Sequence, residues 1–241
     1  MAGKFIRGAL VEFMDTFLLP LPNVIIFQYN PETISHTWTQ PQAASSANGR
    51  SNPLAVKGDP GESFQFTLAM DANDMISDGG PVEEGLATAT GIYSRLAALE
   101  MLQYPVVPSG QSGLLGSVSV SASVGSSGIS LNVSASTPNK RSVPQAQIPM
   151  VLFIWGPGRI LPVRVTSLSV TEKLYDSLLN PTHAEATLGL RVLTPEELQA
   201  LKGTLGKIAN AAYTYSQGLR QALAVANLAN AADSILGMLP V

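Results

Sequence analysis

Three apolar or alternating runs follow one another closely in the second half of this 241-residue chain, and they constrain its fold more than any other feature. Pro149 to Trp155 is hydrophobic throughout, which predicts a fully buried strand. Arg159 to Lys173 and Thr182 to Leu193 alternate apolar with polar side chains, which predicts strands with one buried face. With the turns at 156–158 and 176–181 between them, these runs favour an antiparallel sheet or barrel.

The first half of the chain adds more strands and one helix. Strands are predicted over Lys4–Phe13, Asn23–Tyr29, Thr33–Gln40 and Glu62–Met70. The second and third of these flank Asn30-Pro31, a step that favours a turn, and they are predicted to form an antiparallel pair. The polar stretch 71–80 is predicted to be a turn. Apolar side chains then recur at helical spacing from Val82 to Leu102, which predicts one packed helix.

The segment from Ser109 to Gln147 is dominated by serine, glycine, valine and alanine, and its only charges are Lys140 and Arg141. Such a composition is typical of a flexible, linker-like insertion. Apolar and small polar residues nevertheless alternate in its centre, so a β-hairpin that turns at Gly125 to Gly128 is a second interpretation. The sequence leaves both interpretations open.

The C-terminal part of the chain is predicted to be helical. Thr194 is a candidate N-cap, Pro195 stands at the first helical position and Glu197 completes a capping box. Alanine-rich sequence with apolar residues three and four apart continues towards the C-terminus. We therefore expect an α+β protein: an antiparallel β-barrel or sandwich domain over 1–193 with one packed helix, followed by a C-terminal helical extension over 194–241.

Charged residues make up only 13 % of the chain, about half the usual share. A chain with so few charges is expected to cover much of its surface in an assembly. The net charge of −3 does not favour nucleic-acid binding, and the absence of cysteine excludes a disulfide scaffold, a thiolate metal site and thiol catalysis. No stretch reaches the ~18 apolar residues of a membrane-spanning helix, and a cytoplasmic chain is the expectation.

The sequence offers no catalytic, metal-binding or cofactor-binding constellation. His36 and His183 are the only histidines, and each lies in or beside a predicted strand. Either could act as a base or a metal ligand, but a half-exposed strand histidine is the simpler interpretation. Phosphate-binding glycine motifs and a G-x-S-x-G elbow are missing. We therefore expect no cofactor and no enzyme, although a hydrolase that uses one of the histidines stays an alternative.

Two stretches carry a resemblance to a known family. The first contains Phe27, Asn30 and Pro31 in an F-x-x-N-P step. In the second, Trp155-Gly156 ends the buried strand, and a turn with Asp176, Asn180 and Pro181 leads into the last strand. In their order and spacing, these residues resemble the tube-forming proteins of phage-tail-like contractile injection systems, in particular the tube adaptors at the baseplate end. The resemblance covers roughly 5–103 and 149–192.

The resemblance implies a tail-tube-like domain that joins side by side into a six-membered ring. Such rings stack around an open lumen, join the spike hub to the tube and nucleate tube assembly. The implied partners are copies of the chain and the tube, spike-hub, baseplate and sheath proteins of one particle, assembled in the cytoplasm and then released or anchored. Adaptors of this kind often end in a LysM module, which 202–213 and 226–241 faintly resemble, so a glycan- or wall-binding module is the alternative function.

Overall fold

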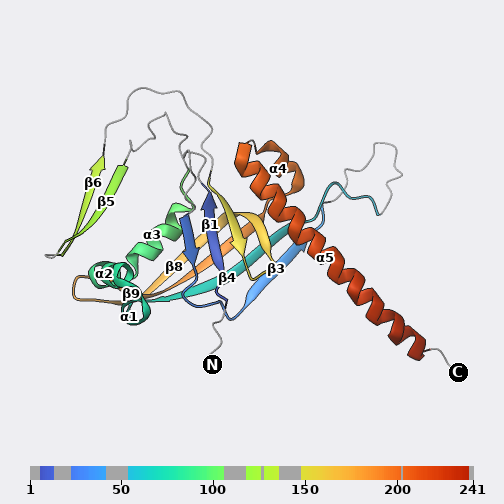
Figure 1. Ribbon diagram of the computed structural model, residues 1–241, viewed down its shortest axis with the longest axis horizontal. Coiled ribbons are helices and arrows are strands. Elements are labelled where there is room, and N and C mark those ends of the chain that lie inside the picture. Colours follow the sequence, from blue (N-terminus) through green and yellow to red (C-terminus); the bar gives the residue numbers. More distant parts are fainter. Residues whose placement is uncertain are drawn as a thin grey trace.

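The structure is a computed structural model that describes residues 6–13, 23–41, 54–105, 118–125, 128–135, 148–201 and 203–238. A seven-stranded sheet forms its centre, short helices cover one end of this sheet, and a long helix crosses the sheet and continues past it (Figure 1). The predicted α+β class with an antiparallel sheet is confirmed.

All strand pairs of the main sheet are antiparallel. In pairing order the strands are β2 (Asn23–Ile26), β1 (Ala9–Phe13), β7 (Met150–Ile154), β8 (Ile160–Tyr175), β9 (Pro181–Val192), β4 (Gly61–Asp71) and β3 (Ile34–Thr39). The order ends at β2 and β3, which do not pair with each other in the described part of the chain. The predicted strands are present, but a closed barrel is not seen.

The predicted pairing of the second and third strands is wrong. β2 pairs with β1, where Ala9 lies opposite Ile26, whereas β3 pairs with β4, where Ile34 lies opposite Phe66. The two strands therefore form opposite edges of the sheet, and the chain between them crosses from one edge to the other. Alternation predicts which face of a strand is buried, but it carries no information about which strand lies beside it.

Aromatic side chains from the two halves of the sheet meet in the core. Phe153 on β7 stacks on Phe66 of β4 at 5.5 Å between ring centroids, and Phe64 lies 5.2 Å from Phe153. Phe27, just beyond β2, lies 5.6 Å from Phe66. Because β2 and β7 lie on the opposite side of the sheet from β4 in pairing order, these contacts require a strongly curved sheet. The alternating phenylalanines of β4 are thus the centre of the core.

Short helices replace the predicted turn and the predicted single helix: α1 (Ala72–Asp78), α2 (Pro81–Thr90) and α3 (Tyr93–Met101). The turn prediction was wrong because Asp71 acts as an N-cap, its side chain accepting a hydrogen bond from the Asn73 amide. The predicted helix is interrupted at Gly91, which has φ +59°. A β-carbon at Gly91 would lie 2.2 Å from the Pro181 carbonyl oxygen, so contact with β9 divides the helix.

The C-terminal extension forms α4 (Pro195–Ala200) and α5 (Gly203–Met238). The predicted capping box at Thr194 and Glu197 is present. Val11 of β1 and Leu152 of β7 lie on the face of the sheet away from the aromatic core. Ile208 and Ala212 of helix α5 pack on these two side chains and cover that face. It then continues past the sheet towards the C-terminus (Figure 1).

Part of the biased segment 109–147 is described. β5 (Val118–Gly125) and β6 (Gly128–Ala135) pair antiparallel with Gly125 opposite Gly128. This pairing agrees with the hairpin interpretation. The remaining residues of the segment lie outside the described part of the chain.

Candidate functional site

Phe27 and Trp155, two residues of the family resemblance, are packing residues. Their rings lie 6.4 Å apart, and Trp155 also stacks on Phe153 at 6.3 Å. Gly8 lies against both rings, because a β-carbon there would be 2.7 Å from an atom of each. These side chains therefore fix the start of β1 against the ends of β2 and β7, and they present no reactive group.

Asn30 holds the N-terminal segment against the Phe27–Pro31 bend. Its side-chain oxygen accepts a hydrogen bond from the Gly8 amide at 2.9 Å, and its side-chain nitrogen donates to the Ile6 carbonyl at 2.9 Å. Pro31 follows at once and keeps Asn30 out of a helical conformation. Gly156, with φ +68°, closes the tight turn in which the Trp155 amide donates to the Arg159 carbonyl. All these residues serve the fold.

Asp176, Asn180 and Pro181 form a second group, at the turn between β8 and β9. The Oδ1 atom of Asp176 accepts hydrogen bonds from the amides of Leu178 and Asn180 at 2.7 and 2.8 Å. Its Oδ2 atom accepts one from the Asn180 side chain at 2.8 Å, and these bonds lower the Asp176 pKa below its ordinary value. Pro181 accepts from the Ile92 amide, so the turn is fixed to the junction of α2 and α3.

His36 belongs to a buried ionic cluster that the sequence did not predict. Its Nε2 lies 2.6 Å from a carboxylate oxygen of Glu62, and Arg220 of α5 binds the two Glu62 oxygens with its guanidinium. The Glu62 side chain is only 5 % exposed. Burial lowers the His36 pKa below its ordinary value, although Glu62 acts in the opposite direction. The cluster joins β3, β4 and α5, three elements separated widely in sequence.

The two histidines lie in different places. His183 on β9 is 3.3 Å from the carboxylate of Asp71. Asp71 is the last residue of β4, whereas His36 lies opposite Phe64 near the start of β4. Seven residues of extended strand separate the two positions by about 23 Å. They do not form one site, and among the described residues their hydrogen-bond partners are Glu62 and Asp71, with no serine or threonine that could act as a nucleophile.

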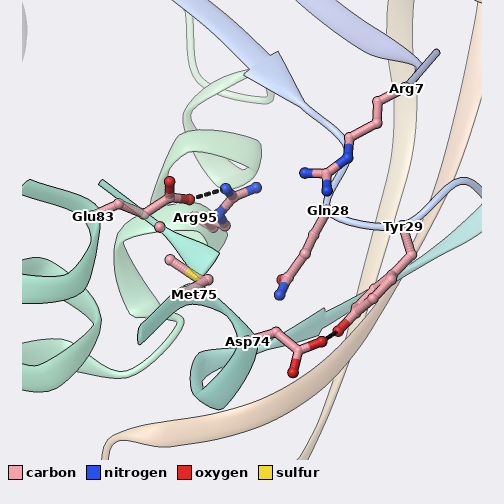
Figure 2. Close-up of a pocket in the computed structure, with 8 residues that line it drawn as sticks. Arg7, Gln28, Tyr29, Asp74, Met75, Glu83 and Arg95 are labelled. Carbon is pink, nitrogen blue, oxygen red and sulfur yellow. Dashed lines mark hydrogen bonds and ion pairs between the residues drawn. The ribbon is translucent and has the colours of Figure 1, made fainter. Parts of the chain in front are cut away.

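A small cavity of about 80 Å³ lies between the chain after β2 and the helices α1 to α3 (Figure 2). Gln28 anchors its wall, since the side-chain nitrogen donates to the Asp71 carbonyl and the side-chain oxygen accepts from the Asp71 amide. Tyr29 donates to Asp74, and Arg95 binds both Glu83 and the Ile26 carbonyl. These polar groups bind one another, and the space suits a few waters rather than an organic substrate.

β3 is an edge of the sheet, and no other strand in the described part of the chain pairs with its outer side. Its six residues include no acidic, lysine, arginine or proline residue, and the Trp38 side chain is 54 % exposed. Monomeric proteins usually protect an edge strand with charge, proline or a bulge, because its unpaired backbone groups can pair with another chain. The opposite edge differs. β2 is short, its Val24 and Ile26 are about half exposed, and the Ile26 carbonyl already accepts from Arg95.

α5 changes character along its length. Between Gly203 and Arg220, one face of the helix consists of buried or half-buried residues that pack on the sheet. Every residue from Gln221 to Asn227 is exposed. Leu223 and Val225 are among these exposed residues. The stretches 202–213 and 226–241 faintly resemble a LysM module, and their described parts, 203–213 and 226–238, lie in this one continuous helix and so do not fold back on each other.

In the described part of the chain no group of acidic or histidine side chains is placed to hold a metal ion, and none of the helices found there has the length and hydropathy to cross a bilayer. The residues of the family resemblance thus form two structural groups rather than one chemical site. No protein-family model matches the sequence, and no curated protein matches it either.

Proposed function

We propose that this chain is a structural subunit that joins side by side with copies of itself into a ring, as a tube adaptor at the baseplate end of a contractile injection particle. The observation that carries this proposal is the open, uncharged edge strand β3 with its exposed Trp38. In this proposal the chain performs no chemistry, and its function lies in the geometry of the assembly.

A second copy that pairs with β3 would form hydrogen bonds with the backbone N–H and C=O groups that point outward from this edge. It would also cover Trp38, whose ring lies 3.6 Å from that of His36. Burial of an aromatic side chain contributes about 2–3 kcal/mol, so a contact centred on Trp38 gives useful affinity. The 13 % share of charged residues across the chain also supports an extensively covered surface.

The two sheet edges are unlike each other, which favours a ring over a two-fold dimer. β3 is six residues long with an exposed tryptophan, whereas β2 is four residues long and partly capped by Arg95. A contact between two different surfaces repeats from copy to copy until the rotation closes. The resemblance at Phe27, Asn30, Pro31 and the later motifs supports a ring of the tail-tube kind, with six members.

The exposed part of α5 provides a second contact in this proposal. Its exposed residues from Gln221 to Asn227 carry no charge. A helix draws most of its stability from the packing of one face, so a projecting helix of this composition needs a neighbour. We assign it to the clamping of adjacent baseplate subunits, with the tube, spike-hub and sheath proteins as the wider set of partners.

Substitution of β3 tests the proposal. Thr37→Lys places a charge at the centre of the edge strand, and Thr88→Lys adds the same charge on the exposed surface of α2 as a matched control. We expect electron microscopy of the purified chain to show rings for the wild type and for Thr88→Lys, and sedimentation to show monomers for Thr37→Lys. A wild-type chain that stays monomeric at high concentration and never enters sheathed particles would contradict the proposal, as would rings formed equally well by Thr37→Lys.

A further inference from the structure

His36 lies between the two contact surfaces of the proposed ring, the β3 edge and helix α5. Its ring stacks on the ring of Phe64, with 4.0 Å between the centroids, and it lies 3.6 Å from the ring of Trp38. Phe64 is buried and the His36 side chain is 13 % exposed, whereas Trp38 is 54 % exposed. The three rings therefore form a continuous row from the core of the sheet to its exposed edge.

The hydrogen bonding of His36 suits the neutral imidazole. A neutral ring has one N–H donor, and donation from Nε2 explains the 2.6 Å contact with the Glu62 carboxylate. Protonation would add a second N–H, at Nδ1. No described residue accepts a hydrogen bond from Nδ1, so this proton would have no protein partner in that part of the chain.

The charges that face His36 also oppose its protonation. Among the described residues they come from three elements: Glu62 of β4, Arg220 of α5 and Arg159 of the turn between β7 and β8. The Arg220 guanidinium already binds both oxygens of Glu62. A protonated His36 would therefore be a third cation beside one carboxylate that is only 5 % exposed.

We propose that His36 is an acid-sensitive link between the two contact surfaces, so that protonation of its ring weakens both the pairing at β3 and the hold of Arg220 on Glu62. This inference rests on the proposed ring and names the condition that loosens it. The coupling is reciprocal: because Arg220 disfavours a proton on His36, that proton disfavours the Arg220 contact by the same free energy. Helix α5 is therefore held less firmly at acidic pH.

Pairing at β3 is coupled to His36 through burial. A second copy beside β3 would cover Trp38 and remove the remaining water from the His36 ring. Burial is the largest cause that lowers the His36 pKa in the single chain, so further burial lowers this pKa again. The association should then weaken as the pH falls below the His36 pKa of the single chain, which itself lies below 6.5. Above that pKa, His36 leaves the association independent of pH.

Sedimentation equilibrium of the full chain between pH 5 and 7.5 tests the link. For the wild type we expect the association constant of each contact to fall by up to about tenfold per pH unit on the acid side. His36→Gln keeps a side-chain N–H donor for Glu62, and His36→Phe keeps an aromatic ring. Neither side chain takes up the proton, so both variants should lose this pH dependence. His183→Gln is the matched control, because it removes the other histidine, about 23 Å away, and should keep the dependence.

Arg220→Met tests the connection to α5. Loss of this cation makes His36 easier to protonate, so the acid weakening should begin at a higher pH than in the wild type. An unchanged onset would overturn the connection to α5. Rings whose association is constant from pH 5 to 7.5, or whose acid weakening persists in both His36 variants, would overturn the link and leave the ring proposal intact. A wild type that is monomeric at every pH would overturn the ring proposal, and the acid-sensitive link with it.

Discussion

Removal of Arg220 is the sharpest probe of how α5 is held on the sheet. In the wild type, one Glu62 oxygen contacts His36 and Arg220, and the other accepts from Arg220 at 2.8 Å. Arg220→Met preserves the aliphatic part of the side chain and leaves a carboxylate that is 5 % exposed without its permanent cation. Loss of one partner from a buried ion pair costs about 3–5 kcal/mol.

The expected cost here is smaller than that range. The Arg220 side chain is 33 % exposed, so water screens part of its attraction to Glu62. We therefore expect a loss of about 2 kcal/mol in the free energy of unfolding at pH 7.5. In urea this corresponds to a decrease of about 1 M in the midpoint.

The loss of unfolding free energy caused by Arg220→Met should be smaller at lower pH. Arg220 disfavours protonation of His36, so its removal raises the His36 pKa and leaves Glu62 as a partner for the imidazolium. Relative to the parent, a higher folded-state pKa of His36 adds stability at pH values below both folded pKa values, and this gain disappears as the pH rises through them. Each unit of rise returns about 1.4 kcal/mol at low pH.

Urea unfolding between pH 5.5 and 7.5 measures how the stability difference changes with pH. Two chains are compared, with and without Arg220→Met, and both carry Thr37→Lys so that they stay monomeric. Proton NMR follows the two histidines separately. Arg191→Met is the control, because its partner Glu197 is 40 % exposed, against 5 % for Glu62, and has no histidine partner, so it should cost less than about 1 kcal/mol at every pH. A stability difference for Arg220→Met that is constant or grows as the pH falls would refute the reasoning.

Three further predictions follow from the same structure. In the wild type the lowered His36 pKa means that the unfolded chain binds the proton more readily, so stability should fall as the pH drops below 6.5, and His36→Phe should flatten this dependence in urea titrations. Ser216→Ala removes the hydroxyl that accepts from the Ile160 amide and donates to the Ile160 carbonyl, and calorimetry should show a loss of about 1–3 kcal/mol. Gly8→Ala forces a methyl group against Phe27 and Trp155, so about 1–3 kcal/mol should be lost, and an unchanged thermal midpoint would contradict this packing.

The residues that carry the family resemblance lie in two separate places in the structure. Phe27 and Trp155 meet in the core, whereas Asp176 and Asn180 brace the turn between β8 and β9. Spacing along the chain does not show which motifs meet, because that depends on sheet curvature. The Leu178-Leu179 step is visible in the sequence, but only the structure shows that both side chains are exposed.

The sequence by itself determined local structure where short-range physics decides it. Alternation defined the buried faces of β4 and β9, and the residues from Thr194 to Glu197 defined a helix start, because both depend on side chains only a few positions apart. Tertiary structure alone decided which strands lie at the edges of the sheet. It also decided that the helix is interrupted at Gly91, which contacts Pro181, and that Glu62 pairs with His36 and Arg220. Each of these depends on contacts between distant segments, and the free energy that selects them arises only when the whole sheet packs.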